Sequence, residues 1–481
     1  MGTSKNTYKG TKTVFYSIGT IVAMNVATVI NIYGFPSEAF YGLTSISLYG
    51  IALIVFLVPV ALVSAELGAM YAREEGGIYV WVSKAFNYKT GIFATWLQWV
   101  QSVFFYPLSL TFAAVPFSYV FPDLSISAQI SNNKFYIIAF ILLVFWLCTF
   151  IGTRGLKHIG RVSLYGVWIG IIIPVCLLIA FGAYYAFSGG QVDMSTEAST
   201  LLPHFHNIDQ VVMAVSIMLF FSGLEVNGVH VYMMKKPSTE YPKALLLTCI
   251  IIGVIYIMGT LSVSMIIPSG QLSITQSVIV AFKNYFSYTG LRILLPIIAV
   301  ALTFGVVANS LTWIAGPASV LKYIAEQGYL PNIVQKKNRR GAPVFILISQ
   351  AIVVTILVCI YALSSKVQQG YQMLLQMTNA IYLTMYVILF VAFIRLRYKD
   401  KQTPRPFMAG KSLPVAWIIA LVGLISAVFS FILCFFSPTQ LDISNKGGYV
   451  GVLFIIYLIL ILPPVAYVMF RKNKKNLPVN T

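Results

Sequence analysis

Apolar runs of bilayer-spanning length recur along the whole chain, and short polar segments separate them. A transmembrane helix needs about 20 mainly apolar residues. The pattern therefore predicts an all-α membrane protein, with the bilayer as the solvent for most of its surface. We place about twelve spans, at residues 13–34, 44–70, 91–121, 134–153, 162–187, 209–233, 243–267, 291–321, 343–363, 371–394, 413–436 and 449–470.

The segments between the spans are short, and none is expected to form a soluble domain. Residues 13–394 are predicted to form a core of ten helices. Residues 395–412 are expected to be a cytoplasmic loop that leads to the last two helices at 413–470. Residues 1–12 and 471–481 are predicted to be short cytoplasmic tails. One membrane domain is the simplest organisation.

Composition and charge fit this reading. The chain has 481 residues, of which 58% are hydrophobic and 9% are charged, whereas soluble domains carry roughly a quarter charged residues. The net charge of +19 would suit a nucleic-acid partner, but its placement argues otherwise. With the N-terminus inside, 27 of the 32 Lys and Arg residues fall in cytoplasmic segments, as the positive-inside rule requires. The basic excess therefore orients the protein with both termini in the cytoplasm, and the basic loops 336–340 and 471–475 become anchors near anionic lipid.

The sequence offers no catalytic or metal-binding pattern. The five cysteines all lie in apolar runs without metal-ligand spacing, so they are expected to be small core residues. A phosphate-binding glycine loop, a nucleophile elbow and an HExxH motif are all missing from the sequence. We therefore expect no enzymatic activity, no ATP use, no metal and no cofactor.

The sixth predicted span contains the most informative polar segment. Ser222, Gly223, Glu225, Asn227 and Gly228 lie within seven residues in the middle of an apolar run. A carboxylate at mid-bilayer costs roughly 2.5–3.5 kcal/mol on insertion scales, and glycines make local unwinding easy. The segment predicts a helix break with a ligand or proton site. The alternative is that Glu225 only satisfies backbone donors released by the break.

The first predicted span has a weaker polar pattern. Asn25, Thr28 and Asn31 recur at a spacing of three and so share one helical face, and Gly34 and Pro36 close the segment. Transporters built from inverted repeats break corresponding helices, and the first and sixth spans would correspond. A polar stripe that joins neighbouring helices explains the same residues equally well.

Together with several other stretches, these segments resemble the amino acid–polyamine–organocation permeases, and among them the bacterial glutamate/GABA antiporter family. The matching stretches follow the family's order over nearly the whole chain: Ala65-Glu66-Leu67, residues 74–82, Gly223-Leu224-Glu225, residues 237–242, residues 313–317 and residues 341–344. The resemblance implies a LeuT-type fold. Two inverted five-helix repeats then carry discontinuous helices 1 and 6, and two further helices follow.

The resemblance also implies a function. Its members exchange an external amino acid for its decarboxylated amine by alternating access in the bacterial cytoplasmic membrane. The implied partners are amino acid and amine substrates, membrane lipid and, functionally, a cytoplasmic decarboxylase, in a monomer or homodimer. No nucleic-acid partner is implied.

Site residues follow from the same resemblance. The residues expected to contact substrate are Thr28, Val29, Ile30, Asn31, Tyr33, Ser222, Gly223, Leu224, Glu225, Trp313, Tyr382 and Tyr386. Proton coupling or gating is assigned to Glu225 and Glu66. For Glu66, a solvated ion-pair cluster with its neighbours Glu74 and Glu75 and with Arg73 and Lys84 is the main alternative.

The substrate pair stays open at this stage. No acidic residue besides Glu225, and no Lys or Arg, is expected deep in a span, which favours an uncharged side chain. A tyrosine/tyramine-like or glutamate/GABA-like pair is favoured over agmatine/putrescine or histidine/histamine exchange, and an amino acid/proton symporter of the same fold is the main alternative. The chain stops about ten residues after its last predicted span. Closure by a long C-terminal plug, as in the family's enteric member, is therefore not expected.

Overall fold

A computed structural model describes residues 16–72, 74, 76–121, 123–154, 162, 165–205, 207, 210–326, 328, 332–339, 341–361, 366–438 and 445–470. Within these ranges the elements are helical, and the pairing of Tyr16 with Met234 is an isolated bridge rather than a strand. The predicted all-α class is confirmed. The two predicted tails, 1–12 and 471–481, lie outside the described residues, as do Arg73 and Glu75.

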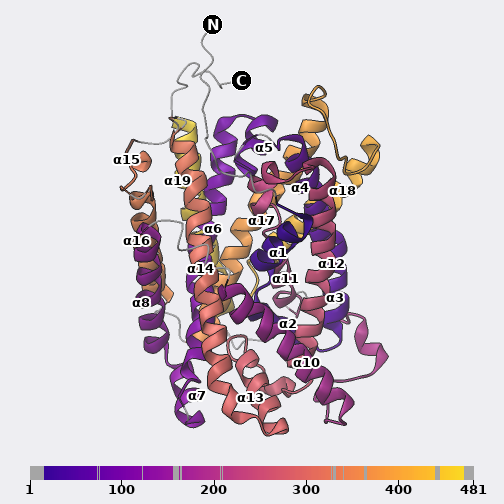
Figure 1. Cartoon of the computed structure of the whole chain (residues 1–481), viewed down its shortest axis with the longest axis vertical. Coiled ribbons are helices and arrows are strands. Elements are labelled where there is room, and N and C mark those ends of the chain that lie inside the picture. Colours follow the sequence, from indigo (N-terminus) through magenta and orange to yellow (C-terminus); the bar gives the residue numbers. More distant parts are fainter. Residues whose placement is uncertain are drawn as a thin grey trace.

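The helices run mostly along one common direction and form a single bundle (Figure 1). In chain order the principal elements are α1 (Ile18–Val29), η1 (Ile32–Gly34), α2 (Phe35–Ala39), α3 (Thr44–Ala52), η2 (Leu53–Leu57), α4 (Val58–Met70), α5 (Ile78–Ala85), α6 (Tyr88–Ser118), α7 (Leu124–Asn132), α8 (Lys134–Thr153), η3 (Trp168–Ile172), α10 (Ile173–Phe187), η6 (Met213–Val215), α11 (Ser216–Phe220), η7 (Val226–Met233), α12 (Pro237–Ser264), α13 (Ser277–Thr289), α14 (Leu295–Glu326), α15 (Asn332–Gln335), α16 (Val344–Tyr361), α17 (Val367–Lys399), α18 (Leu413–Leu433) and α19 (Lys446–Phe470).

Among the described residues, nine helices are long and apolar enough to cross a membrane, or ten if the bent pair Ile18–Val29 and Ile32–Ala39 counts as one span. Two further predicted spans do not reach this length. The sixth is broken into η6, α11 and η7, and the ninth is a shorter apolar helix, Val344–Cys359. The chain is therefore a multi-pass membrane protein, and the count of twelve stays a prediction.

Several helices begin at side chains that cap them. The side chain of Asn87 accepts a hydrogen bond from the Thr90 amide at the start of α6, and Asn133 accepts from the amides of Phe135 and Tyr136 at the start of α8. Such caps satisfy amide groups that have no partner inside the helix. Short polar residues between apolar runs thus fix where spans begin.

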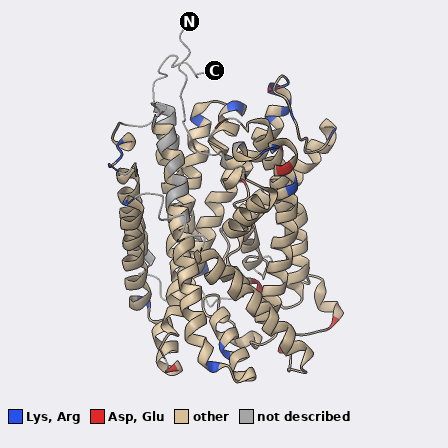
Figure 2. Cartoon of the chain, viewed as in Figure 1, with Lys and Arg blue, Asp and Glu red and all other residues tan. Residues whose placement is uncertain are grey.

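The core and the lipid-facing surface separate clearly. The most apolar stretch of α6 is 94% buried and that of α17 is 78% buried, whereas the corresponding stretch of α18 is only 33% buried. Apolar side chains that remain exposed on outer helices suit contact with lipid rather than water. Most charged residues drawn in Figure 2 lie near the two ends of the bundle, where headgroups and water begin.

Candidate functional site

The first span is broken where the sequence predicts it. Helix α1 ends at Val29, and Ile30 and Asn31 have extended backbones with φ −72°, ψ 116° and φ −126°, ψ 105°. The chain then resumes at η1 and α2 with a bend of 44°. β-branched residues at Thr28, Val29 and Ile30 favour leaving the helix here, because their side chains crowd the preceding turn.

The sixth span is broken as well. Helix α11 ends at Phe220, the next residues are not helical, and η7 begins at Val226. Gly223 lies in this break with φ +112°, a conformation that side-chain-bearing residues rarely adopt. The discontinuous first and sixth helices that the resemblance implies are thus present. The two-fold relation between the five-helix repeats stays a prediction.

Glu225 lies at the break of the sixth span and is fully paired. The hydroxyls of Tyr382 and Tyr386 on α17 donate to its two carboxylate oxygens, each at 2.6 Å. The hydroxyl of Tyr386 also accepts a hydrogen bond of 2.8 Å from the Gly223 amide. Tyr386 therefore joins the carboxylate and the released backbone of the break in one network.

Several other predicted residues converge on Gly223. A Cβ placed on this glycine would lie 3.5 Å from Thr28 Cγ2 and 3.9 Å from Cη2 of Trp313 on α14. The Trp313 ring packs in turn against Phe105 of α6, with ring centroids 5.5 Å apart. The structure thus brings together residues of the first, sixth, eighth and tenth predicted spans. Whether they contact substrate stays a prediction.

The polar stripe of the first span does two different things. Asn227 of η7 donates hydrogen bonds to Asn25 at 2.8 Å and to Thr28 at 3.2 Å, so these two residues join the broken helices. Asn31 instead accepts from the Tyr33 hydroxyl at 2.7 Å and from Asn309 of α14 at 3.2 Å. The interpretation as interhelical contacts holds for all three residues, and Asn31 in addition lies in the break.

Tyr256 of α12 is a central residue that the sequence analysis missed. Its buried hydroxyl lies 3.0 Å from the Val29 carbonyl, 3.3 Å from the Phe220 carbonyl and 3.0 Å from the Asn31 amide, which donates to it. One side chain therefore serves released backbone groups at both breaks. Nothing in its local sequence distinguishes it from the other 28 of the 29 tyrosines.

Replacing Tyr256 by phenylalanine is expected to lower the free energy of unfolding by about 1–3 kcal/mol, because buried backbone groups lose a partner that no water replaces. The measurement is thermal unfolding in detergent. Tyr288→Phe is the matched control, since the Tyr288 hydroxyl bonds Ser188 at an exposed position. An equal shift for the two variants would contradict the role given to Tyr256.

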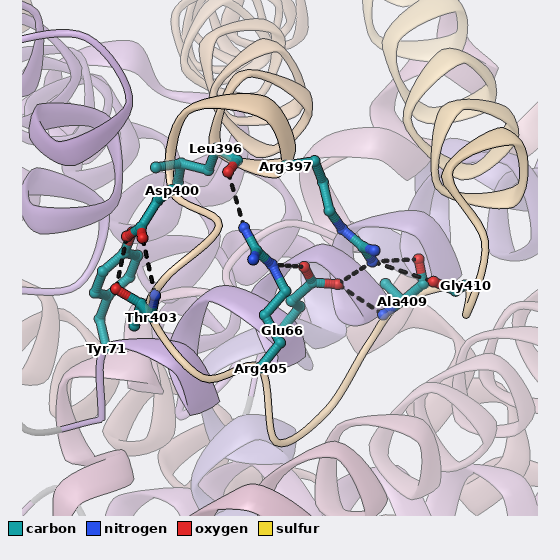
Figure 3. Close-up of polar contacts among 9 residues, drawn as sticks. All are labelled: Glu66, Tyr71, Leu396, Arg397, Asp400, Thr403, Arg405, Ala409 and Gly410. Atoms are coloured by element: carbon teal, nitrogen blue, oxygen red, sulfur yellow. Dashed lines mark hydrogen bonds and ion pairs between the residues drawn. The ribbon is translucent and has the colours of Figure 1, made fainter.

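Glu66 forms a buried ion-pair cluster at one end of the bundle (Figure 3). From α4 its carboxylate pairs with the guanidinium of Arg397 at the end of α17. It also accepts from Arg405 Nε at 3.1 Å and from the Ala409 amide at 2.7 Å. Arg397 donates further to the carbonyls of Ala409 and Gly410. The cluster ties the loop after α17 onto α4.

The same loop has a second attachment beside the first (Figure 3). Asp400 accepts from the Tyr71 hydroxyl at 2.8 Å and from the amide and hydroxyl of Thr403. Partial burial raises the pKa of Asp400, but the hydrogen bonds from Thr403 and Tyr71 and the charge of Arg405 outweigh it, so the pKa lies below its ordinary value. Charged and hydrogen-bonded contacts thus hold the loop after α17 against α4 and Tyr71.

The expected solvated cluster around Glu66 is only partly correct. Glu74 does pair with Lys84, at 3.0 Å, and both side chains are about two-fifths exposed. Glu66 itself is buried and pairs with arginines that lie more than 300 residues later in the chain. The expectation that Glu66 is exposed to solvent is therefore wrong. Its role in proton coupling or gating stays a prediction.

Glu225 is not the only buried acidic residue among the described residues, because Glu38 and Glu66 are buried too, and the Arg397 side chain is 6% exposed. Glu66 and Arg397 lie at one end of the bundle, and Glu38 lies near the end of α2, so none of the three lies deep in a span. The preference for an uncharged substrate side chain stays a prediction. Among the described residues no three His, Cys, Asp or Glu side chains are grouped to hold a metal ion.

Comparison with known proteins fits this geometry. The sequence profile of the amino acid permease family matches residues 11–462, nearly the whole chain. The chain belongs to the amino acid permease family. As a permease of this family it is a membrane transport protein, and its broken helices coincide with the breaks expected of the superfamily.

Three individual relatives of the chain are named as transporters or antiporters. The permease is 31% identical over 429 residues to an uncharacterized transporter of Legionella pneumophila, covering 89% of this chain and 91% of the relative. It is 26% identical to a glutamate/gamma-aminobutyrate antiporter of Lactococcus lactis, covering 94% and 90%. It is also 28% identical to a probable agmatine/putrescine antiporter of the same species, covering 79% of each chain.

Proposed function

We propose that this permease exchanges an external amino acid for its decarboxylated amine by alternating access. The observation that carries the proposal is the pair of helix breaks that Tyr256 joins, with Glu225 at the sixth-span break held by Tyr382 and Tyr386. Similarity to a glutamate/gamma-aminobutyrate antiporter and to a probable agmatine/putrescine antiporter supports the exchange mode, and the first of these is named for an amino acid and its decarboxylated product. The bacterial relatives and the charge pattern support a cytoplasmic membrane location with both termini inside.

The two breaks suit the two ends of an α-amino acid. Backbone amides after Asn31, at the start of the outer half of the first span, would hold the carboxylate, as helix starts hold anions. Backbone carbonyls around Ser222 and Leu224 would accept from the amino group, with Glu225 close behind.

Closure of the site is part of the proposed cycle. Tyr33, Asn31, Ser222 and Trp313 are all buried in this structure, so substrate enters only after the helices move. The Glu66 cluster lies at the end of the bundle that the charge pattern predicts to face the cytoplasm. We assign it as the inner clasp that opens when amine or amino acid passes to that side.

The substrate pair is proposed as glutamate/GABA-like or tyrosine/tyramine-like, with a cytoplasmic decarboxylase that converts the imported amino acid. Agmatine/putrescine and histidine/histamine exchange are the other pairs. The test uses purified protein in liposomes loaded with one amine each, against a panel of labelled external amino acids. We expect one pair to give uptake well above that of unloaded vesicles.

Exchange also predicts how the empty carrier behaves. Tyr256 and Tyr386 bond some of the backbone groups released at the two breaks, and without substrate any group they leave unpaired costs free energy when it is buried. Efflux of labelled amine should therefore be at least about tenfold slower without external amino acid than with it, a barrier difference of about 1.4 kcal/mol. Equal efflux rates would exclude obligatory exchange. Uptake into unloaded vesicles that requires only a pH gradient would instead indicate a proton symporter.

A further inference from the structure

Glu38 is a third buried carboxylate, and the proposed transport site does not use it. It lies on α2, the short helix that continues the first span beyond its break, and it is 0% exposed. Its side chain faces α11, the corresponding short helix of the sixth span, because the Ser216 hydroxyl donates to Oε1 at 2.6 Å. Glu38 thus joins the same halves of the two broken spans.

The second oxygen of Glu38 distinguishes it from the other buried acids. Oε2 is buried and finds no hydrogen-bond partner in the part of the chain that the structure describes. Glu225 has a tyrosine hydroxyl on each oxygen, and Glu66 has two arginines and an amide. Glu38 therefore has the least support for a negative charge of these three carboxylates.

No positive charge compensates Glu38 among the described residues. None of their Lys, Arg or His side chains comes within the 4.0 Å that defines an ion pair with it, including partly buried Lys283 on α13, which packs against α2. The other titratable groups on the elements around α2 include the tyrosines Tyr33 on η1, Tyr49 on α3, Tyr256 on α12, and Tyr285 and Tyr288 on α13. Helix α12 also carries Glu240, Tyr241, Lys243 and Cys249, which lie 15 or more residues before Ser264, the residue that bonds the α2 carbonyl of Ala39.

An isolated charge in such surroundings is strongly disfavoured. Moving an unpaired carboxylate from water into an apolar interior costs far more than binding a proton, so such groups become neutral. A protonated carboxyl keeps the hydrogen bond with Ser216 and needs no counter-ion. The closed arrangement of α2 and α11 therefore fits the neutral form of Glu38.

We propose that Glu38 is a proton-binding site that latches α2 to α11, so that proton uptake closes this side of the transporter and proton release opens it. The charge pattern predicts that this side faces outward. When α2 and α11 separate, water reaches the carboxyl and stabilises its charged form. Because the closed state binds the proton more tightly, acid favours closure and alkaline conditions favour opening.

A neighbouring contact gives a matched control. The Tyr41 hydroxyl, shortly after α2, donates to the Gln210 carbonyl at 2.6 Å and accepts from the Ala214 amide at 3.1 Å. This contact also joins the outer half of the first span to the start of the sixth, and a tyrosine does not titrate between about pH 5 and about pH 8. Tyr41→Phe should therefore loosen the closure equally at both pH values.

The first test detects the proton directly. Infrared spectra of the purified protein in lipid, at about pH 7, should contain a protonated-carboxyl C=O band that Glu38→Gln removes. Glu225→Gln reports any contribution of Glu225, and Glu197→Gln, in an exposed loop, should leave the band unchanged. An unchanged band in Glu38→Gln would overturn the proposal, because Glu38 would then be ionised while buried.

The second test detects the latch. The measured quantity is the hydrogen-exchange rate of the α2 and α11 amides, corrected for the intrinsic rates and normalised to the rate of α18. In the wild type, the ratio of this rate at about pH 8 to that at about pH 5 should be at least about five. In Glu38→Gln, a permanent mimic of the neutral acid, that ratio should fall to about one. A Glu38→Gln ratio equal to the wild-type ratio overturns the proposal. Replacement of sodium by choline should leave the wild-type ratio unchanged, and a ratio that depends on sodium would assign the site to that cation instead.

The inference uses the proposed function only for its alternating-access motion. Both measurements work without a known substrate, so they can succeed while the amino acid/amine exchange assignment fails. Conversely, the protein could exchange an amino acid for an amine while the α2–α11 contact does not depend on pH. That result would refute the role of Glu38 and leave the proposed exchange intact.

Discussion

Glu66→Ala is expected to lower the free energy of unfolding by about 3–5 kcal/mol. The substitution leaves the guanidinium of Arg397, whose side chain is 6% exposed, without its counter-ion, and arginine does not lose its proton to compensate. Arg405 and the Ala409 amide lose the same acceptor. Thermal unfolding of the purified protein in detergent measures the effect. We also expect the loop after α17 to lose its ordered structure.

Two comparisons identify the cause. Glu74→Ala breaks the exposed pair with Lys84 and should cost at most about 1 kcal/mol, because water screens that pair. The double variant Glu66→Leu with Arg397→Leu should recover part of the loss, since it removes the unpaired charge as well. A loss in Glu66→Ala no larger than in Glu74→Ala would show that the cluster adds little to stability.

Gly223→Ala is expected to slow exchange by roughly 5–150-fold, which corresponds to about 1–3 kcal/mol of backbone strain. The glycine has φ +112°, a value that a residue with a Cβ rarely adopts. Its amide bonds the Tyr386 hydroxyl at 2.8 Å, so relaxing the strain would also displace the partner of Glu225. Initial rates of labelled amino acid uptake into amine-loaded liposomes measure the effect.

The backbone, rather than lack of space, should cause this loss. An added Cβ would meet its nearest neighbour, Thr28 Cγ2, at an ordinary contact distance of 3.5 Å. Gly50→Ala is the matched control: it lies within helix α3 with no heavy atom within 4 Å of the added methyl. That variant should keep its exchange rate and gain up to about 1 kcal/mol of stability. If the Gly223→Ala variant exchanged substrate at the wild-type rate, the break would tolerate other backbone conformations.

The helix breaks could be predicted because their causes are local. Gly223 and Glu225 in an apolar run are unusual on their own, and the β-branched residues before Asn31 mark the other break. Tyr382 and Tyr386 were named from the family resemblance and from a spacing of four, which places them on one face of a helix. That both hydroxyls donate to Glu225 depends on how α17 packs against the break, some 160 residues away in the chain.

The errors also have a physical reason. Glu66 was expected near Arg73 and Lys84 because those residues are close in sequence, but its partners are Arg397 and Arg405. Glu38 lies beyond the end of the first predicted span, and the sequence pattern does not single it out. It is buried because α2, which carries it, packs beside the sixth span, where Ser216 donates a hydrogen bond to it. Sequence distance is a poor guide to the partners of charges that fold into a bundle.

The sequence by itself determined the membrane class, the charge asymmetry and the break of the sixth span, because hydropathy and glycine act over a few residues. The family and the break of the first span came from the resemblance of ordered motifs. The tertiary structure alone decided which polar groups meet: Tyr256 between the two breaks, the arginines on Glu66, and Ser216 on Glu38. In an apolar interior each polar group must find a partner or lose its charge. Those partners come from helices far apart in the chain.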